Sequence, residues 1–363
     1  MGAQRDKAVQ ARLPMAASRI ECGDDRPVAL YVPVHAGPRR RIARGLTLAM
    51  DPAQSGIPHF AVELAPPDIS PWLPGNTGVR GFTTFKSGQP GPHVAVVAAL
   101  HGNEIAGAVV LDRLLRRGIR PGRGQLTLGF ANIAAFARFD PAQPTASRFL
   151  DEDMNRLWDP AVLDSPRRSA ELDRAREIRP LVDTVDVLLD LHTMLWPSEP
   201  LILSGPTLQG RSLAAALGVP ELVVADSGHV TGPRLIDYPH FTAPGQSAAA
   251  VLVEAGQHWQ PAAVEVTDAC VAGLLRHTGL ADGPAEAPRP RCAEVTMTIT
   301  AVTAGFAFVQ AFRGGEVIPR RNTLIAVDGT AEIRTPHDDC LLVMPSLRPS
   351  RGHTAVRLAR FVQ

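Results

Sequence analysis

Apolar and polar positions form a regular pattern between about residues 78 and 278. Short apolar runs predict buried strands, and segments with apolar residues three and four positions apart predict helices. The expected strands are residues 79–86, 93–100, 125–131, 185–191, 200–204, 222–225 and 250–254. The expected helices are residues 105–117, 167–178, a segment near 210–217, and 262–278. Strands that alternate with helices predict an α/β fold, with a mixed, mostly parallel sheet covered by helices on both faces.

The pattern changes on either side of this block. Residues 1–55 form a poorly patterned lead-in, expected to be partly disordered or to supply edge strands, with one candidate strand at 28–34. A catalytic domain is expected over residues 56–280, and the segment 281–291, rich in Pro, Ala and Glu, reads as a linker. Residues 292–363 predict a C-terminal β-rich domain, because short strand-like runs alternate there with turns. Those runs are residues 294–300, 305–311, 323–327, 331–334, 340–344 and 356–361.

Composition and charge exclude several classes of protein. A chain of 363 residues with 45% apolar residues is long enough for about two folded domains. The net charge of +1 lacks the basic excess of a nucleic-acid binder. The apolar runs are shorter than the ~20 residues that a membrane helix needs. The four cysteines form no C-x-x-C pair, and the first residues show no secretory pattern. Both observations favour a cytoplasmic location for the protein. We therefore expect neither a nucleic-acid nor a membrane partner.

Two motifs contain candidate metal ligands. His101 and Glu104 follow the predicted strand 93–100 and open the next helix, where a spacing of three lets both side chains reach one atom. His192 ends another predicted strand, and the carboxyl ends of parallel strands meet at one edge of a sheet. Each residue alone could be an ordinary polar side chain. Together, two imidazoles and a carboxylate match a catalytic zinc site, which has three protein ligands and an open position.

Other polar residues supply candidates for chemistry on a substrate. Asn155 and Arg156 could hold a carboxylate, since a guanidinium is a planar two-pronged donor, and Arg148 could polarise a carbonyl. The charged segment around them is equally compatible with a solvated loop. Glu254 ends an apolar run, where it could be capped by backbone donors or act as a general base. No G-x-G-x-x-G or complete phosphate-binding loop is present, which excludes dinucleotide and phosphate-loop chemistry.

Four motifs, taken in order along the chain, resemble those of one known family. They are HGNE at 101–104, R-x6-NR from Arg148, DLHT at 190–193 and V-E-x-G around Glu254. That family is the succinylglutamate desuccinylase/aspartoacylase family, whose catalytic domain is shared with zinc carboxypeptidases. The resemblance is clearest over residues 73–278 and extends through the β-rich tail. It implies a zinc carboxypeptidase-like fold and one Zn2+ per chain.

The resemblance also implies a role for each matching residue. His101, Glu104 and His192 would hold the zinc, Glu254 would be the base and later the proton donor, and Arg148 would stabilise the oxyanion. Asn155 and Arg156 would bind the substrate carboxylate, and Asp153 would be the partner that orients His101. In the loop 227–245, Arg234 and Tyr238 are the candidates for the family's additional substrate-binding Arg and Tyr.

The leading functional prediction is a zinc amidohydrolase that removes an acyl group from an N-acyl amino acid or a related small carboxylate. A zinc carboxypeptidase acting on short peptides is the alternative, because the same residues would serve both reactions. A non-enzymatic binder with a degenerate site is a further alternative, but each expected catalytic position holds a competent residue type. The small-molecule substrate is the expected partner, and homo-oligomerisation stays open.

Overall fold

The computed structural model describes residues 60–283 and 288–362, all of which belong to one compact unit. The lead-in 1–55 and the candidate strand at 28–34 lie outside the described residues. The first described elements are a 3-10 turn, η2 (Ser70–Trp72), and the edge strand β1 (Phe82–Lys86).

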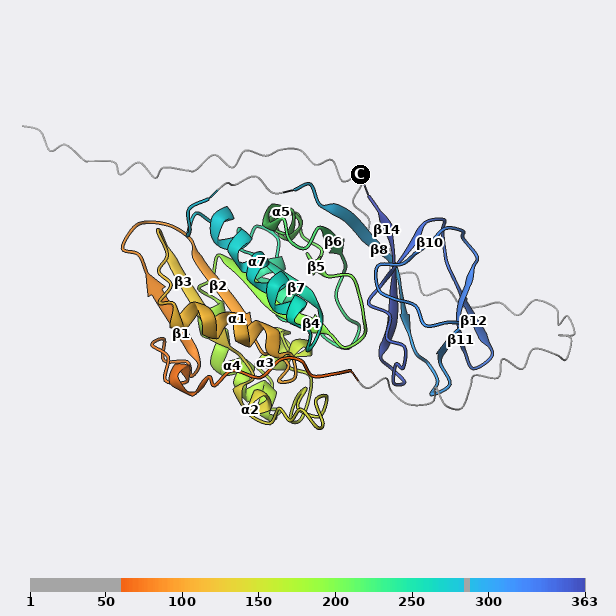
Figure 1. Ribbon diagram of the computed structural model, residues 1–363, viewed down its shortest axis with the longest axis horizontal. Helices are drawn as coiled ribbons and strands as arrows, with labels where there is room; N and C mark the ends of the chain where they lie inside the picture. Colours follow the sequence, from red (N-terminus) through yellow and green to blue (C-terminus); the bar gives the residue numbers. More distant parts are fainter. Residues whose placement is uncertain (1–59, 284–287, 363) are drawn as a thin grey trace, which may run out of the picture. The chain divides into compact units, whose positions relative to one another are not determined.

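Within the described residues, eleven strands form one mixed sheet (Figure 1). In spatial order they are β1, β3 (Gln125–Phe130), β2 (His93–Ala98), β4 (Val187–Met194), β7 (Ala249–Gln257), β5 (Leu201–Leu203), β6 (Leu222–Ala225), β8 (Arg291–Thr300), β14 (Thr354–Phe361), β13 (Cys340–Val343) and β10 (Val317–Ile318). The strands β3, β2, β4 and β7 run parallel to one another, whereas β1 and β5 run antiparallel to β3 and β7. The sheet is thus parallel where it is most deeply buried, as the unbroken apolar runs predict.

Helices cover both faces of this sheet (Figure 1). On one face α1 (Ile105–Arg116), α5 (Leu208–Leu217) and α7 (Pro261–His277) pack against side chains such as Val94 and Val96. On the other face α4 (Ala170–Val182) packs in the same core as Ala95 and Val97. Since successive side chains of a strand point to opposite faces, β2 contributes to both cores. The predicted α/β class is confirmed.

The short helical elements lie in the connections. They are α2 (Ile133–Phe136), η3 (Met154–Arg156), α3 (Pro160–Leu163), η4 (Leu235–Asp237) and α6 (Pro239–Thr242). No helix in the described part of the chain combines the length and the apolar character that crossing a bilayer requires.

The C-terminal region is rich in strands, as expected. Strand β8 pairs in parallel with β6, and β14, β13 and β10 extend the same sheet in antiparallel fashion. A separate three-stranded sheet is formed by β12 (Ala331–Arg334), β11 (Leu324–Asp328) and β9 (Ala307–Phe308). Arg291, expected in the linker, already lies in β8. The division into the domains 56–280 and 292–363 stays a prediction.

Element ends differ from the sequence expectation by a few residues, and local contacts explain several of these differences. The helix expected from residue 167 begins at Ala170, because the Ser169 hydroxyl accepts a hydrogen bond from the Leu172 amide at 3.0 Å. The first strand begins at Phe82 rather than Val79, since Gly81 adopts a φ of 77°, outside the strand region. Strand β10 was not expected, because its two residues carry no readable alternation.

Candidate active site

The three central parallel strands bring the main candidate residues to one edge of the sheet. His101 and Glu104 follow β2, His192 lies in β4, and Glu254 in β7 is the direct cross-strand neighbour of His192. All four line a single cavity of about 1060 Å³. Their convergence follows from the parallel register of the strands, in which the carboxyl ends meet at the same edge.

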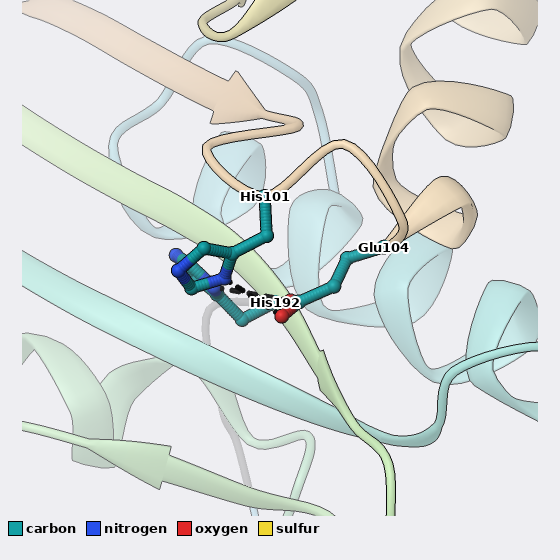
Figure 2. Close-up of side chains that lie close together, drawn as sticks. All are labelled: His101, Glu104 and His192. Carbon is teal, nitrogen blue, oxygen red and sulfur yellow. Dashed lines mark hydrogen bonds and ion pairs between the residues drawn. The ribbon is translucent and has the colours of Figure 1, made fainter. Parts of the chain in front are cut away.

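His101, Glu104 and His192 form a compact buried cluster. Their side chains point toward one another in Figure 2, and their possible ligand atoms lie within 4.8 Å of one another. The Nδ1 atom of His101 is 2.7 Å from one Glu104 oxygen, and the Nδ1 atom of His192 is 3.1 Å from the other. Burial opposes ionisation of Glu104, but the two imidazoles outweigh it and hold the pKa of Glu104 well below its ordinary value. Two nitrogens and a carboxylate oxygen in this arrangement could hold a metal ion.

The far side of each imidazole is also engaged. Asp153 Oδ1 lies 3.0 Å from His101 Nε2. Asp190 Oδ2 lies 2.9 Å from His192 Nε2. The hydrogen bond with Asp153 favours a proton on His101 Nε2, which leaves the Nδ1 lone pair of His101 available toward Glu104.

Steric crowding explains why a glycine occupies the second position of the HGNE motif. A Cβ atom on Gly102 would lie 2.3 Å from the Ala135 carbonyl carbon and 2.5 Å from the Ser147 carbonyl oxygen. The Gly102 amide also donates to the Arg148 carbonyl oxygen at 3.1 Å. Backbone atoms surround this position and cannot move aside easily, so a residue with a side chain would displace His101 or the segment carrying Arg148.

Arg148 lies directly against the cluster. Its Nη1 donates to Glu104 Oε1 at 3.2 Å, and its Nη2 donates to Asp153 Oδ2 at 3.1 Å. The same Nη2 is 3.0 Å from His101 Nε2. The guanidinium therefore lies beside the cluster and on the wall of the cavity, where it could stabilise negative charge on a bound carbonyl oxygen.

Glu254 is buried in the same cavity, with its Oε2 atom unpaired among the described residues. Burial and the neighbouring Glu104 carboxylate raise the pKa of Glu254 to about 8, against the opposing effect of His192 and Arg148. A buried carboxyl with a raised pKa and an unpaired oxygen is typical of a group that exchanges protons with a ligand.

The Asn155–Arg156 pair also lines the cavity. Asn155 Oδ1 accepts from the Leu235 amide at 2.8 Å, and its Nδ2 lies 3.3 Å from His192 Nε2. Arg156 donates to the Asn155 carbonyl oxygen at 2.6 Å. Burial and the nearby Arg148 and Arg357 lower the pKa of Arg156 to about 10. Repulsion among these cations makes an anion favourable at this wall.

Arg234 and Tyr238 lie differently from the other candidates. Arg234 borders the cavity but is 1% exposed, and it makes a two-pronged contact with Asp226 at 2.6 and 3.0 Å. It also donates to both oxygens of Asp237. Tyr238 is not among the cavity-lining residues, and its hydroxyl donates to Asp183 at 2.9 Å. The structure does not bring Tyr238 to the cluster.

Sequence reasoning missed several lining residues, among them Arg357, His229 and His258. Arg357 in β14 is buried, and its Nη2 lies 2.6 Å from His229 Nε2. His258 follows β7, and its Nδ1 is 2.8 Å from the Thr193 hydroxyl. Arg357 and His229 lie in no motif, so no sequence signal marks them. For His258, its position four residues after Glu254 was the one sequence signal that could have placed it near the site.

The fold and the cavity define an α/β protein with a candidate metal centre at the carboxyl edge of its parallel strands. The family model of the succinylglutamate desuccinylase/aspartoacylase catalytic domain matches residues 90–278, more than half of the 363-residue chain. The chain belongs to this family, as the motifs indicated.

Individual relatives agree with this assignment. The chain is 30% identical over 108 residues to an N-acyl-aromatic-L-amino acid amidohydrolase (carboxylate-forming) A of Danio rerio, a match that covers 27% of this chain and 32% of that relative. Succinylglutamate desuccinylase structures from Vibrio parahaemolyticus and Vibrio cholerae superpose with TM-scores of 0.60 and 0.61, at 18% and 17% identity. They cover 78% of this chain, and 87% and 86% of their own chains. At such identities these two structures establish the shared fold.

The buried Arg234–Asp226 pair gives a pH-dependent stability prediction. Burial opposes ionisation of Asp226, but Arg234 and Arg357 outweigh it and lower its pKa. A lowered folded-state pKa stabilises the protein fully above the unfolded value of ~3.9, and this contribution is lost progressively as the pH falls from that value through the folded-state pKa. Asp226→Asn removes one of the two carboxylates that pair with the buried guanidinium, which should lower the free energy of unfolding by up to ~3–5 kcal/mol at pH 7. Urea unfolding at several pH values should show the wild type and the variant converging below pH ~4.

Asp183→Asn is the matched control, because this carboxylate is exposed and accepts only a hydroxyl. Its loss should lower the free energy of unfolding by about 1 kcal/mol. Equal effects of the two substitutions at pH 7 would contradict a structural role for the Arg234 pair.

Proposed function

We propose that the protein is a zinc-dependent amidohydrolase that removes the acyl group from an N-acyl amino acid or a related small carboxylate. The observation that carries the proposal is the meeting of His101, Glu104 and His192 with the unpaired carboxyl of Glu254 in one cavity. Family membership supports it, and so does the amidohydrolase activity in the name of the Danio rerio relative.

The donor set of the cluster fits a zinc ion. Zinc prefers imidazole nitrogen and carboxylate oxygen, and catalytic sites use three protein ligands. The contacts of Asp153 and Asp190 with the Nε2 atoms leave both Nδ1 atoms facing Glu104, as ligation through Nδ1 requires. Bound there, zinc would act as a Lewis acid toward the scissile carbonyl and would make water more acidic.

Glu254 is the general base in this proposal. It takes a proton from water as the water oxygen forms a bond to the acyl carbon, and it then delivers the proton to the leaving nitrogen as the C–N bond breaks. The products are a carboxylic acid and an amine, which become a carboxylate and an ammonium when the acid proton passes to the amine. Arg148 supplies the positive charge that stabilises the carbonyl oxygen as it becomes negative.

Asn155 and Arg156 are proposed to bind the substrate carboxylate, since they lie on the same cavity wall as Arg148. Arg234 is better explained as the buried partner of Asp226 and Asp237 than as a substrate ligand.

Residues of β14 and of the turn before it, including His353, Thr354 and Arg357, also line the cavity. This boundary favours a small ligand, such as an N-acyl amino acid, over a long peptide, because a confined cleft desolvates a small ligand more completely. A cytoplasmic location and a homo-oligomeric state stay predictions.

The metal assignment predicts about one zinc per chain, as expected of a single three-ligand site. The double variant His101→Ala, His192→Ala should lose the metal, because one carboxylate remains. His277→Ala is the control, since this exposed histidine at the end of α7 is remote from the cavity lining. Elemental analysis of the purified proteins measures the outcome, and equal zinc in all three would exclude this site.

The base assignment predicts the behaviour of Glu254→Gln. The amide keeps the size of the side chain but cannot accept the proton, so turnover should fall by ~10²–10⁴. Zinc content should stay at the wild-type level, because Glu254 is not one of the proposed ligands. Steady-state kinetics and metal analysis on the same sample provide the test. Near wild-type turnover would mean that Glu254 has a structural role.

The carboxylate-binding assignment predicts selectivity. A panel of N-acetyl, N-succinyl and N-formyl amino acids, tested beside dipeptides, should identify a cleaved N-acyl amino acid. Its methyl ester or amide should react far more slowly, because the Arg156 guanidinium then lacks a carboxylate partner. An unpaired buried group of this kind raises the activation free energy by ~1–3 kcal/mol, which lowers kcat/KM by roughly tenfold to a few hundredfold. Arg156→Lys should lower activity on the free acid, since an ammonium lacks the planar fork. Equal rates on free and blocked carboxylates would refute the assignment.

A further inference from the structure

Glu171 is a fully buried carboxylate that lies outside the lining of the cavity. It is the second residue of α4, and its two oxygens accept four hydrogen bonds. The donors are Asn132 Nδ2 at 3.0 Å and the backbone amides of Leu150, Asp151 and Glu152 at 2.7, 3.0 and 3.2 Å. Three consecutive amides on one carboxylate show that α4 holds the segment 150–152 in place.

The segment 150–152 and the start of α4 each accept hydrogen bonds from the other. Asp151 Oδ2 accepts from the Ala170 amide at 2.7 Å, and Glu152 accepts from the Ser169 hydroxyl and from Arg167. The segment 150–152 thereby satisfies donors at the start of α4, while Glu171 satisfies the amides of the segment. A carboxylate in the first helical turn is also favoured by the helix dipole. Both oxygens of Glu171 have two hydrogen-bond donors each in this buried position.

The segment 150–152 lies between two residues of the candidate site. Arg148 precedes it and Asp153 follows it, and both contact His101 Nε2 at 3.0 Å. Between α2 and α4 the chain contains only the short elements η3 and α3, so regular secondary structure does little to fix it. The four hydrogen bonds to Glu171 provide the missing constraint.

We propose that Glu171 is a positioning residue that holds Arg148 and Asp153 against the metal cluster. Its kinetic consequence rests on the proposed amidohydrolase function. A displacement of ~1 Å at a reacting group can lower the rate by ~10². Asn155 has a separate attachment through the Leu235 amide, so substrate binding depends less on this anchor.

The test is Glu171→Gln, in which an NH2 group replaces an oxygen and faces backbone N–H donors. We expect kcat to fall by ~10–10² with little change in KM and with zinc retained. Hydrogen exchange at the amides of residues 150–152 should become faster. The Thr193 amide, which is bound to Glu104, serves as the internal reference. Glu177→Gln on the same helix is the matched control, since Glu177 is half exposed and pairs with Arg174.

A double-mutant cycle separates positioning from general destabilisation. If Glu171 acts through Arg148, then Glu171→Gln should have little further effect on kcat in an Arg148→Ala background. Additive losses, or unchanged exchange at residues 150–152, would overturn the proposal. If Glu171→Gln fails to fold, Asn132→Ala replaces it, because this variant removes one of the four hydrogen bonds to Glu171. Asn132→Ala should then lower kcat by a smaller factor, and it should have little further effect on kcat in the Arg148→Ala background.

A wild-type protein without deacylase activity would count against the proposed function and not against the anchor. The exchange measurement then tests the anchor alone, because it needs neither substrate nor turnover.

Discussion

The buried carboxylate of Glu104 connects the separate parts of the candidate site. It contacts the imidazoles of His101 and His192, accepts from the Thr193 amide at 2.9 Å, and accepts from Arg148. An ionised carboxylate is stable in a buried position only when such partners surround it. The end of β2, the end of β4 and the segment carrying Arg148 must therefore meet around this one group.

The charges around the cavity are unevenly compensated, and this unevenness indicates what the site would bind. Arg234 has two carboxylates, and Arg148 has Asp153 and Glu104. Arg156 lies 3.9 Å from the nearest Asp153 oxygen, and Arg357, whose Nε lies 3.4 Å from Asp226, shares that carboxylate with Arg234. An anionic ligand would complete the charge balance of this wall, which agrees with a carboxylate-bearing substrate.

Continuity of the large sheet explains how distant parts of the chain reach the same cavity. Strand β8 pairs with β6, and β14 pairs with β8, so Arg357 is positioned by a ladder of backbone hydrogen bonds. Arg357, near the C-terminal end of the described residues, thus borders a cavity whose candidate metal ligands are His101, Glu104 and His192.

The amino-acid sequence by itself determined the α/β class, most of the strands and helices, and the polar residues at the carboxyl ends of β2, β4 and β7. Those predictions depend on local periodicity and on motifs such as HGNE, whose spacing is readable along the chain. Only the tertiary structure decided that Tyr238 lies away from the cavity, that Arg234 is occupied by Asp226 and Asp237, and that Arg357, His258 and Glu171 have distinct places around the site. Contacts between residues far apart in the chain, such as Arg357 with His229 at a separation of 128 positions, leave no periodic signal, because they arise from strand order and the packing of loops.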